Sequence, residues 1–153
     1  MDLKLGGTSW DPDVSPEKVA YKQAKWRHQH EIALNVEGCH VTGQHHGKGK
    51  WREIQDDQGA EQGVRQALAL FFGARGADSR GMLASFLAQI ETIRDWFQNQ
   101  MLFHFINSSL LFVSDDTHAC VFMVDFAHVW PANTVDAECI RGLERLARML
   151  RGL

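Results

Sequence analysis

The sequence of 153 residues is poor in cysteine and proline and has no long apolar run. Its three cysteines, Cys39, Cys120 and Cys139, lie far apart and form no CxxC pair. This spacing argues against a disulfide framework or a structural zinc site and favours a reducing compartment, so we expect the cytoplasm or the nucleus. No apolar segment approaches the roughly 18 residues that a membrane span needs, and residues 1–7 do not read as a signal peptide. We therefore expect a chain that is neither secreted nor inserted in a membrane.

The sequence also lacks the short motifs of the commonest hydrolases and of the Walker-type phosphate loop. Its net charge of −3 gives no general attraction to nucleic acid or anionic membranes, so anion binding must come from a local basic patch. Nucleic-acid binding through the C-terminal arginines is disfavoured for the same reason. A zinc site is disfavoured too, because adjacent histidines on a polar loop do not supply a tetrahedral set; the histidines concerned are His28, His30, His40, His45 and His46.

With 44% hydrophobic residues, the chain is expected to form one domain over residues 1–153. The alternation in MDLKLG predicts a strand at the start, and Ser15-Pro16-Glu17 is typical of a helix start, here for a helix over 16–33. On that helix, Val19 and Trp26 are expected to face the core. Apolar spacing predicts further elements: strands at 35–41 and 51–54 joined by a glycine-rich loop, helices over 60–73 and 79–100, a buried hairpin of 109–113 with 120–126, and a C-terminal amphipathic helix.

Asp2 and Lys4 are the first candidates for chemistry. Two residues apart on a strand, they point to the same face, where a carboxylate beside an ammonium can handle a hydroxyl proton and a phosphate. A structural surface ion pair is the alternative interpretation.

Lys18, Lys22 and Lys25 fall at i, i+4 and i+7, which places three ammonium groups along one face of the first helix. Like charges repel there unless an anion neutralises them. The face is either simply solvated or a site for a multiply phosphorylated ligand.

Asp125 follows an apolar strand in the segment VFMVDFAHVW, residues 121–130. A carboxylate in that setting suits a magnesium ion that also holds nucleotide phosphates. The alternative is a buried aspartate satisfied by backbone amides of the next turn. His128, three residues on, either donates a hydrogen bond to a substrate oxygen or caps the turn.

Three segments together resemble the inositol polyphosphate kinase family, and its multikinases more than its hexakisphosphate kinases. They are DLKLG at 2–6, SSLLFV at 108–113 and MVDFAHVWPANT at 123–134, which match the family's PxxxDxKxG, SSLL and (I/V)DFAH segments in order. The resemblance covers nearly the whole chain. It implies an α+β fold, namely the C-terminal lobe of a two-lobed, protein-kinase-like or SAICAR-synthase-like kinase.

The same resemblance implies transfer of phosphate from ATP, with Mg²⁺, to a hydroxyl of an inositol polyphosphate. Asp2 would be the base or hydroxyl orienter, Lys4 would contact phosphate, and Asp125 would bind the metal. The substrate contacts would be Lys18, Lys22, Lys25 and His128, although Lys22 stands where multikinases have a glutamine. Ser109 would belong to the metal and phosphate surround, and Leu111 with Val124 would form the apolar floor under adenine.

The resemblance begins inside the PxxxDxKxG segment, without its proline. The N-terminal lobe that carries the ATP-phosphate lysine and the hinge in this family is therefore expected to be missing. Three hypotheses follow: the chain is a fragment, another polypeptide supplies the lobe, or the chain is a non-enzymatic module that binds inositol phosphates or proteins.

Overall fold

The computed structural model describes residues 1–73, 79–115 and 117–153. Its main sheet is antiparallel throughout, and its strands lie in the order β3-β2-β1-β5-β6. Their bounds are β1 (Asp2–Leu5), β2 (Leu34–Val41), β3 (Gln44–Gly47), β5 (Ser109–Ser114) and β6 (Ala119–Val124). A second, two-stranded sheet pairs β4 (Phe103–Phe105) with β7 (Val129–Pro131).

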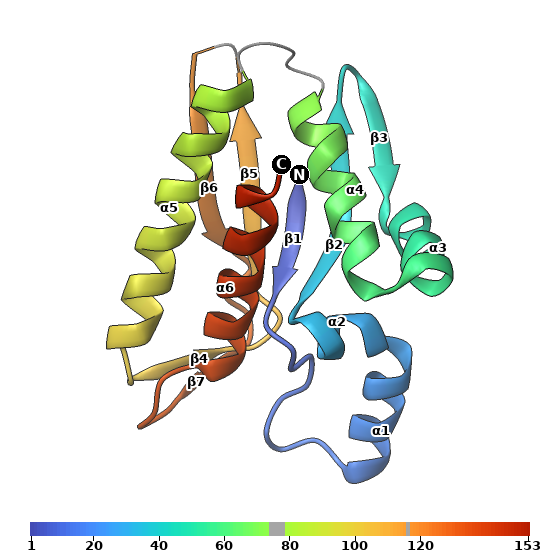
Figure 1. Ribbon diagram of the computed structural model, residues 1–153. Helices are drawn as coiled ribbons and strands as arrows, with labels where there is room; N and C mark the ends of the chain where they lie inside the picture. The colour runs from blue at the N-terminus through green and yellow to red at the C-terminus, as the bar shows by residue number, and fades with distance from the viewer. Residues whose placement is uncertain (74–78, 116) are drawn as a thin grey trace.

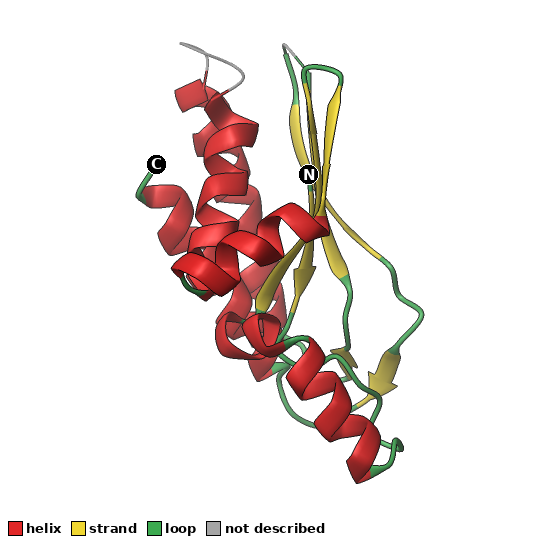
Figure 2. Cartoon of the chain, turned by 90° about the vertical axis from the view of Figure 1, so that its right-hand side faces the viewer, coloured by secondary structure: helices red, strands yellow, loops and turns green. Residues whose placement is uncertain are grey.

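The long helices gather on one side of the main sheet, as Figures 1 and 2 show. The helices in the described part of the chain, short ones included, are α1 (Pro16–Lys25), α2 (Arg27–Ile32), α3 (Lys48–Gln58), α4 (Ala60–Gly73), α5 (Ser79–Asn99) and α6 (Ala137–Arg151). No helix among the described residues is long and apolar enough to cross a membrane.

The core lies between these helices and one face of the sheet. Leu3, Leu5, Leu110 and Phe112 alternate with polar or half-exposed neighbours on β1 and β5 and are at most 1% exposed. The helix α6 can approach β1 closely because it carries glycine at position 142, where a Cβ would lie 2.8 Å from Cδ1 of Leu5 and 2.5 Å from the Ala33 carbonyl oxygen. Burial of these apolar side chains fixes which face of β1 and β5 is left for polar residues.

Most of the predicted elements are confirmed. The N-terminal strand, the helix over 60–73, the long helix that ends at Asn99, and the C-terminal helix are present. The strand predicted at 35–41 is confirmed as β2.

The strand predicted at 51–54 is wrong, because these residues belong to α3. Trp51 and Gln55 are buried one helical turn apart. The four residues 51–54 are too short a window to reveal this helical spacing in the sequence. The partner of β2 is instead β3, inside the predicted loop. Thr42 and Gly43 both have positive φ, 50° and 76°, and this pair makes the tight hairpin turn that joins the two strands.

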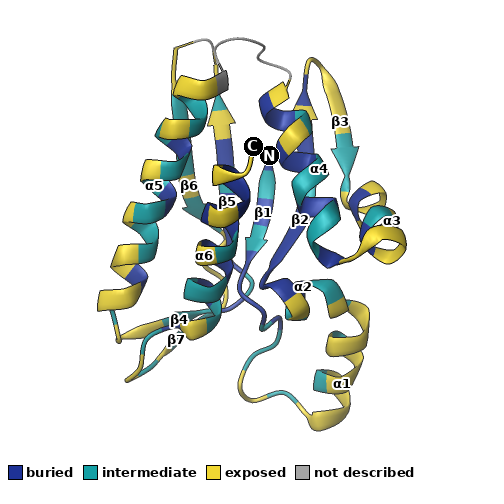
Figure 3. Cartoon of the chain, in the orientation of Figure 1, coloured by how far each residue is buried: buried dark blue, intermediate teal, exposed yellow. Residues whose placement is uncertain are grey.

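The helix predicted over 16–33 is interrupted at Trp26, which ends α1 and precedes α2. The expected core positions Val19 and Trp26 are only half-buried, and α1 contains no buried residue (Figure 3). This helix extends away from the body of the molecule, so the packing that would bury one of its faces is absent among the described residues.

The predicted hairpin forms, but only β5 is buried. β6 is an edge strand with half-buried positions, and Phe122 on it is 51% exposed. An apolar run was therefore not enough to distinguish a central strand from an edge strand.

Candidate active site

Five of the predicted site residues share one face of the main sheet. Asp2 pairs with Leu111, Lys4 pairs with Ser109, and Ser109 also pairs with Val124 on β6. Side chains directly opposite one another in an antiparallel sheet lie on the same face. This face is the one turned away from the long helices (Figure 2).

At the end of β1, Lys4 forms an ion pair with Asp125, which follows the last residue of β6. The Lys4 ammonium also donates to the Asn107 carbonyl oxygen at 2.9 Å. Asp125 adopts a left-handed backbone with φ 68°, and the Ser108 hydroxyl donates to its carbonyl oxygen at 3.1 Å. The sequence segments DLKLG, NSS and VDF therefore meet at one point.

The alternative interpretation of Asp125, a buried aspartate satisfied by backbone amides of the next turn, is wrong. Its side chain is 49% exposed, whereas that of Lys4 is only 12% exposed. The strand before it lies at the edge of the sheet, so the carboxylate has little to desolvate it. Lys4 contacts Oδ2 of Asp125, and about half of the Asp125 side chain is left accessible to a ligand.

Two further polar atoms of this face have no hydrogen-bond partner among the described residues. They are Oδ1 of Asp2 and the hydroxyl of Ser109, and both atoms are buried. Burying an unpaired polar atom is unfavourable, so both are available to pair with a bound group. A single accessible carboxylate, on the sheet face that also carries the Ser109 hydroxyl, fits Mg²⁺, which is commonly held by one or two carboxylates together with substrate phosphates.

His128 is held from a loop that the sequence did not mark as functional. Its Nδ1 lies 2.9 Å from Oδ1 of Asp11, and the Trp130 indole N–H donates to the same oxygen at 2.8 Å. Partial burial tends to raise the pKa of Asp11, but the hydrogen bonds from Trp130 and His128 outweigh it and lower that pKa. Asp11 lies in a segment rich in turn-forming residues, and that pattern alone gives no sign of a partner 117 residues away.

The three lysines of α1 differ in their surroundings. Lys22 is half-buried and donates to the Ser9 carbonyl oxygen at 2.8 Å. Lys25 is exposed and lies 5.3 Å from the centre of the Trp26 ring, and Lys18 is exposed as well. No hydrogen bond or ion pair joins these lysines to Lys4 or Asp125 in the part of the chain that the structure describes.

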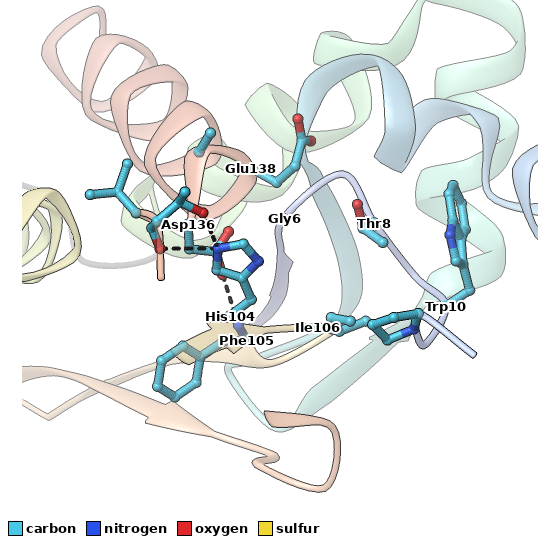
Figure 4. A pocket seen from close by; sticks show the side chains of 12 residues that line it. Gly6, Thr8, Trp10, His104, Phe105, Ile106, Asp136 and Glu138 are labelled. Carbon is cyan, nitrogen blue, oxygen red and sulfur yellow. Dashed lines mark hydrogen bonds between the residues drawn. The ribbon is translucent and has the colours of Figure 1, made fainter. Parts of the chain in front are cut away.

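A cavity of about 410 Å³ lies on the other side of the loop after β1, at the N-terminal end of α6 (Figure 4). Its wall includes Thr8, Trp10, His104 and Glu138, and none of the predicted site residues lines it. Figure 4 shows Asp136 engaged with the Phe105 backbone, where its carboxylate accepts a hydrogen bond of 2.7 Å. The cavity is thus separate from the Lys4 and Asp125 site.

Three of the C-terminal arginines are engaged in ion pairs with glutamates. Arg141, Arg145 and Arg151 form ion pairs with Glu138, Glu61 and Glu91. Within the described residues, no three histidine, cysteine, aspartate or glutamate side chains gather as a metal ion would require.

The fold is that of the inositol phosphate multikinases. A solved inositol phosphate multikinase matches 99% of this chain and 78% of its own, with a TM-score of 0.76 and 24% identity. The S. cerevisiae inositol phosphate multikinase in complex with ADP and Mn²⁺ matches 99% of this chain and 76% of its own, with a TM-score of 0.75 and 19% identity.

The family model of the inositol polyphosphate kinases matches residues 1–151, and the chain belongs to this family. It is 30% identical to the inositol polyphosphate multikinase of Mus musculus over 123 residues, which cover 74% of this chain and 29% of that protein. It is 29% identical to the multikinase beta of Arabidopsis thaliana over 185 aligned residues, which cover all of this chain and 61% of that protein. The chain therefore spans less than two thirds of these relatives.

Proposed function

We propose that this chain contributes the acceptor and metal-binding side of a kinase that transfers the γ-phosphate of ATP to a hydroxyl of an inositol polyphosphate. The observation that carries the proposal is the ion pair of Lys4 and Asp125 at the end of a sheet face that also carries the unpaired oxygens of Asp2 and Ser109. Membership of the inositol polyphosphate kinase family supports it, as does the ADP and Mn²⁺ complex of the yeast relative.

On the nucleotide side, Asp125 would hold Mg²⁺ and Ser109 would lie beside the phosphates. When bound, the metal ion would offset the charge that builds on the phosphate oxygens. Leu111 and Val124 lie half-buried on the same face, where they would form an apolar floor for adenine. Lys4 is paired with Asp125, and with Asp125 engaged on a metal ion the Lys4 ammonium would be available to a phosphate oxygen.

On the acceptor side, Asp2 would accept or orient the proton of the attacking hydroxyl. Lys18, Lys22, Lys25 and His128 would hold the other phosphates of the inositol ring. Positioning and charge neutralisation together are the main contributions that a protein makes to phosphoryl transfer. The three cysteines are free, and this supports a proposed location in the cytoplasm or nucleus.

The test is ATP-dependent phosphorylation of inositol trisphosphate and tetrakisphosphate by the purified chain, compared with Asp125→Asn. We expect the substitution to lower the rate by about 100-fold or more, as the removal of one main electrostatic group does in other enzymes. Asp57→Asn is the matched control, because Asp57 is an exposed aspartate at the end of α3 and outside the site. Its rate should equal that of the unmodified chain.

One result would contradict phosphate transfer by this chain. It is tight binding of inositol trisphosphate with neither turnover nor binding of ATP. That result would support the alternative, a module that binds inositol phosphates without phosphorylating them.

A further inference from the structure

We infer that Asp11 is a positioning residue that fixes the orientation and the tautomer of His128; this inference rests on the proposed function, in which His128 contacts the substrate. Oδ1 of Asp11 receives two contacts from one short segment, His128 at 2.9 Å and the Trp130 indole at 2.8 Å. The Asp11 side chain is 20% exposed, whereas that of His128 is 52% exposed. The carboxylate is thus the sheltered partner and the imidazole is the accessible one.

The chemistry of the pair determines which ring nitrogen carries hydrogen. The Trp130 indole can only donate, so the oxygen that it contacts is an acceptor, and an ionised carboxylate has no hydrogen to offer His128. Nδ1 of His128 must therefore carry hydrogen and donate to Asp11. Nε2 of the neutral ring then carries no hydrogen, so it can accept from a hydroxyl of the substrate, and it donates to a phosphate oxygen only in the imidazolium form, in which both ring nitrogens carry hydrogen.

Both partners are anchored at their backbones. The His128 carbonyl oxygen accepts from the Ile106 N–H at 2.9 Å, and the Asp11 carbonyl oxygen accepts from the Val14 N–H at 3.3 Å. Two residues before Asp11, the Ser9 carbonyl oxygen accepts from Lys22 at 2.8 Å. The loop that carries Ser9 and Asp11 therefore contacts both Lys22 of α1 and His128. Through these two contacts it fixes the position of the imidazole relative to α1.

The tautomer is tested first, by ¹⁵N NMR of the His128 ring in the full chain at a pH where the ring is neutral. We expect hydrogen on Nδ1 in the unmodified chain and loss of that preference in Asp11→Ala. Asp13→Ala is the control, because Asp13 is an exposed aspartate of the same loop. Should Asp11→Ala fail to fold, Asp11→Asn replaces it, because asparagine keeps the volume and an acceptor for Trp130. In that variant the His128 ring should lose part of its preference for hydrogen on Nδ1, because the carboxylate charge is gone. An unchanged Nδ1 preference in the folded variant would overturn the inference.

The second test is a double-mutant cycle on the binding of inositol trisphosphate, measured by calorimetry. Asp11→Ala should weaken binding about tenfold when His128 is present and have no effect in a His128→Ala background, because residues that act through one another are not additive. An equal loss in both backgrounds would overturn the inference, since Asp11 would then act through the fold alone. If the unmodified chain does not bind inositol trisphosphate, the proposed function fails, and the NMR result alone decides the role of Asp11.

Discussion

At the scale of single residues, the backbone conformation of Asp125 determines where its carboxylate lies. The residue adopts a left-handed φ of 68°, which aspartate tolerates better than most residues. That conformation ends β6 and turns the side chain toward Lys4, and the Ser108 hydroxyl holds the strained peptide. Asp125 is therefore placed by its own backbone and by two neighbours from other segments.

His30 is a second residue whose environment sets its behaviour. Its ring packs against Trp10 with centroids 4.8 Å apart, and its Nε2 is buried without a hydrogen-bond partner among the described residues. Burial is the main cause that lowers the pKa of His30. The folded chain therefore disfavours the charged imidazole.

From this we predict a pH dependence of stability. Because the pKa of His30 is lower in the folded than in the unfolded state, the unfolded chain binds more protons below about pH 6.5, and stability falls as the pH decreases from 7 to 5. His30→Phe keeps a ring against Trp10 but cannot titrate, so its free energy of unfolding should fall less over this range. Urea denaturation at pH 7, 6 and 5 measures the effect.

The control for this prediction is His40→Phe, at an exposed position of β2. It should retain the pH dependence of the unmodified chain. Equal slopes for the unmodified chain and His30→Phe would show that another group causes the loss of stability in acid.

At the scale of elements, the edge strand β6 determines where Asp125 lies. The side-chain amide of Gln89 on α5 donates to the Ala119 carbonyl oxygen at 2.7 Å and accepts from the Val121 N–H at 2.9 Å. The Gln89 side chain thus pairs with two backbone groups on the outer edge of β6, as a neighbouring strand would. Unpaired edges of this kind invite pairing with other chains.

We predict that Gln89→Ala lowers the free energy of unfolding by about 1–2 kcal/mol, because two backbone groups lose their partners. The exposed edge should also raise self-association, which sedimentation velocity can measure. Gln98→Ala is the matched control, since Gln98 is an exposed glutamine of the same helix. If both variants remain as stable and as monodisperse as the unmodified chain, the Gln89 contact does not protect the edge.

At the scale of the whole molecule, a net charge of −3 coexists with a basic helix that extends from the body. An anionic ligand gains nothing from the overall charge, so its attraction must come from local lysines. Lys18 and Lys25 are exposed, and charges at the surface are screened by salt.

We predict that Lys18→Gln weakens binding of inositol trisphosphate and lowers the dependence of its affinity on salt concentration. Arg148→Gln is the control, because it removes the same charge from an exposed position on α6, on a different element. Calorimetry at several salt concentrations should separate the two variants. If they behave alike, only net charge matters and the α1 lysines form a solvated face.

Most elements of the fold could be predicted from the sequence, because apolar periodicity marks long helices and alternating strands directly. The errors fell where local pattern is ambiguous. Residues 51–54 are too few to show a helical period, and an apolar run such as that of β6 occurs in edge strands as well as central ones. Trp26 ends α1 without a glycine or proline signal.

For the candidate site, the sequence by itself determined the residue types and the shared face of Asp2 and Lys4, because side chains two apart on a strand must point the same way. Only the tertiary structure decided that Lys4 meets Asp125, 121 residues away, and that Asp11 holds His128. Those contacts depend on strand order and register across the sheet. Strand order and register are fixed by the packing of whole apolar faces against the helices, and no local pattern encodes that packing.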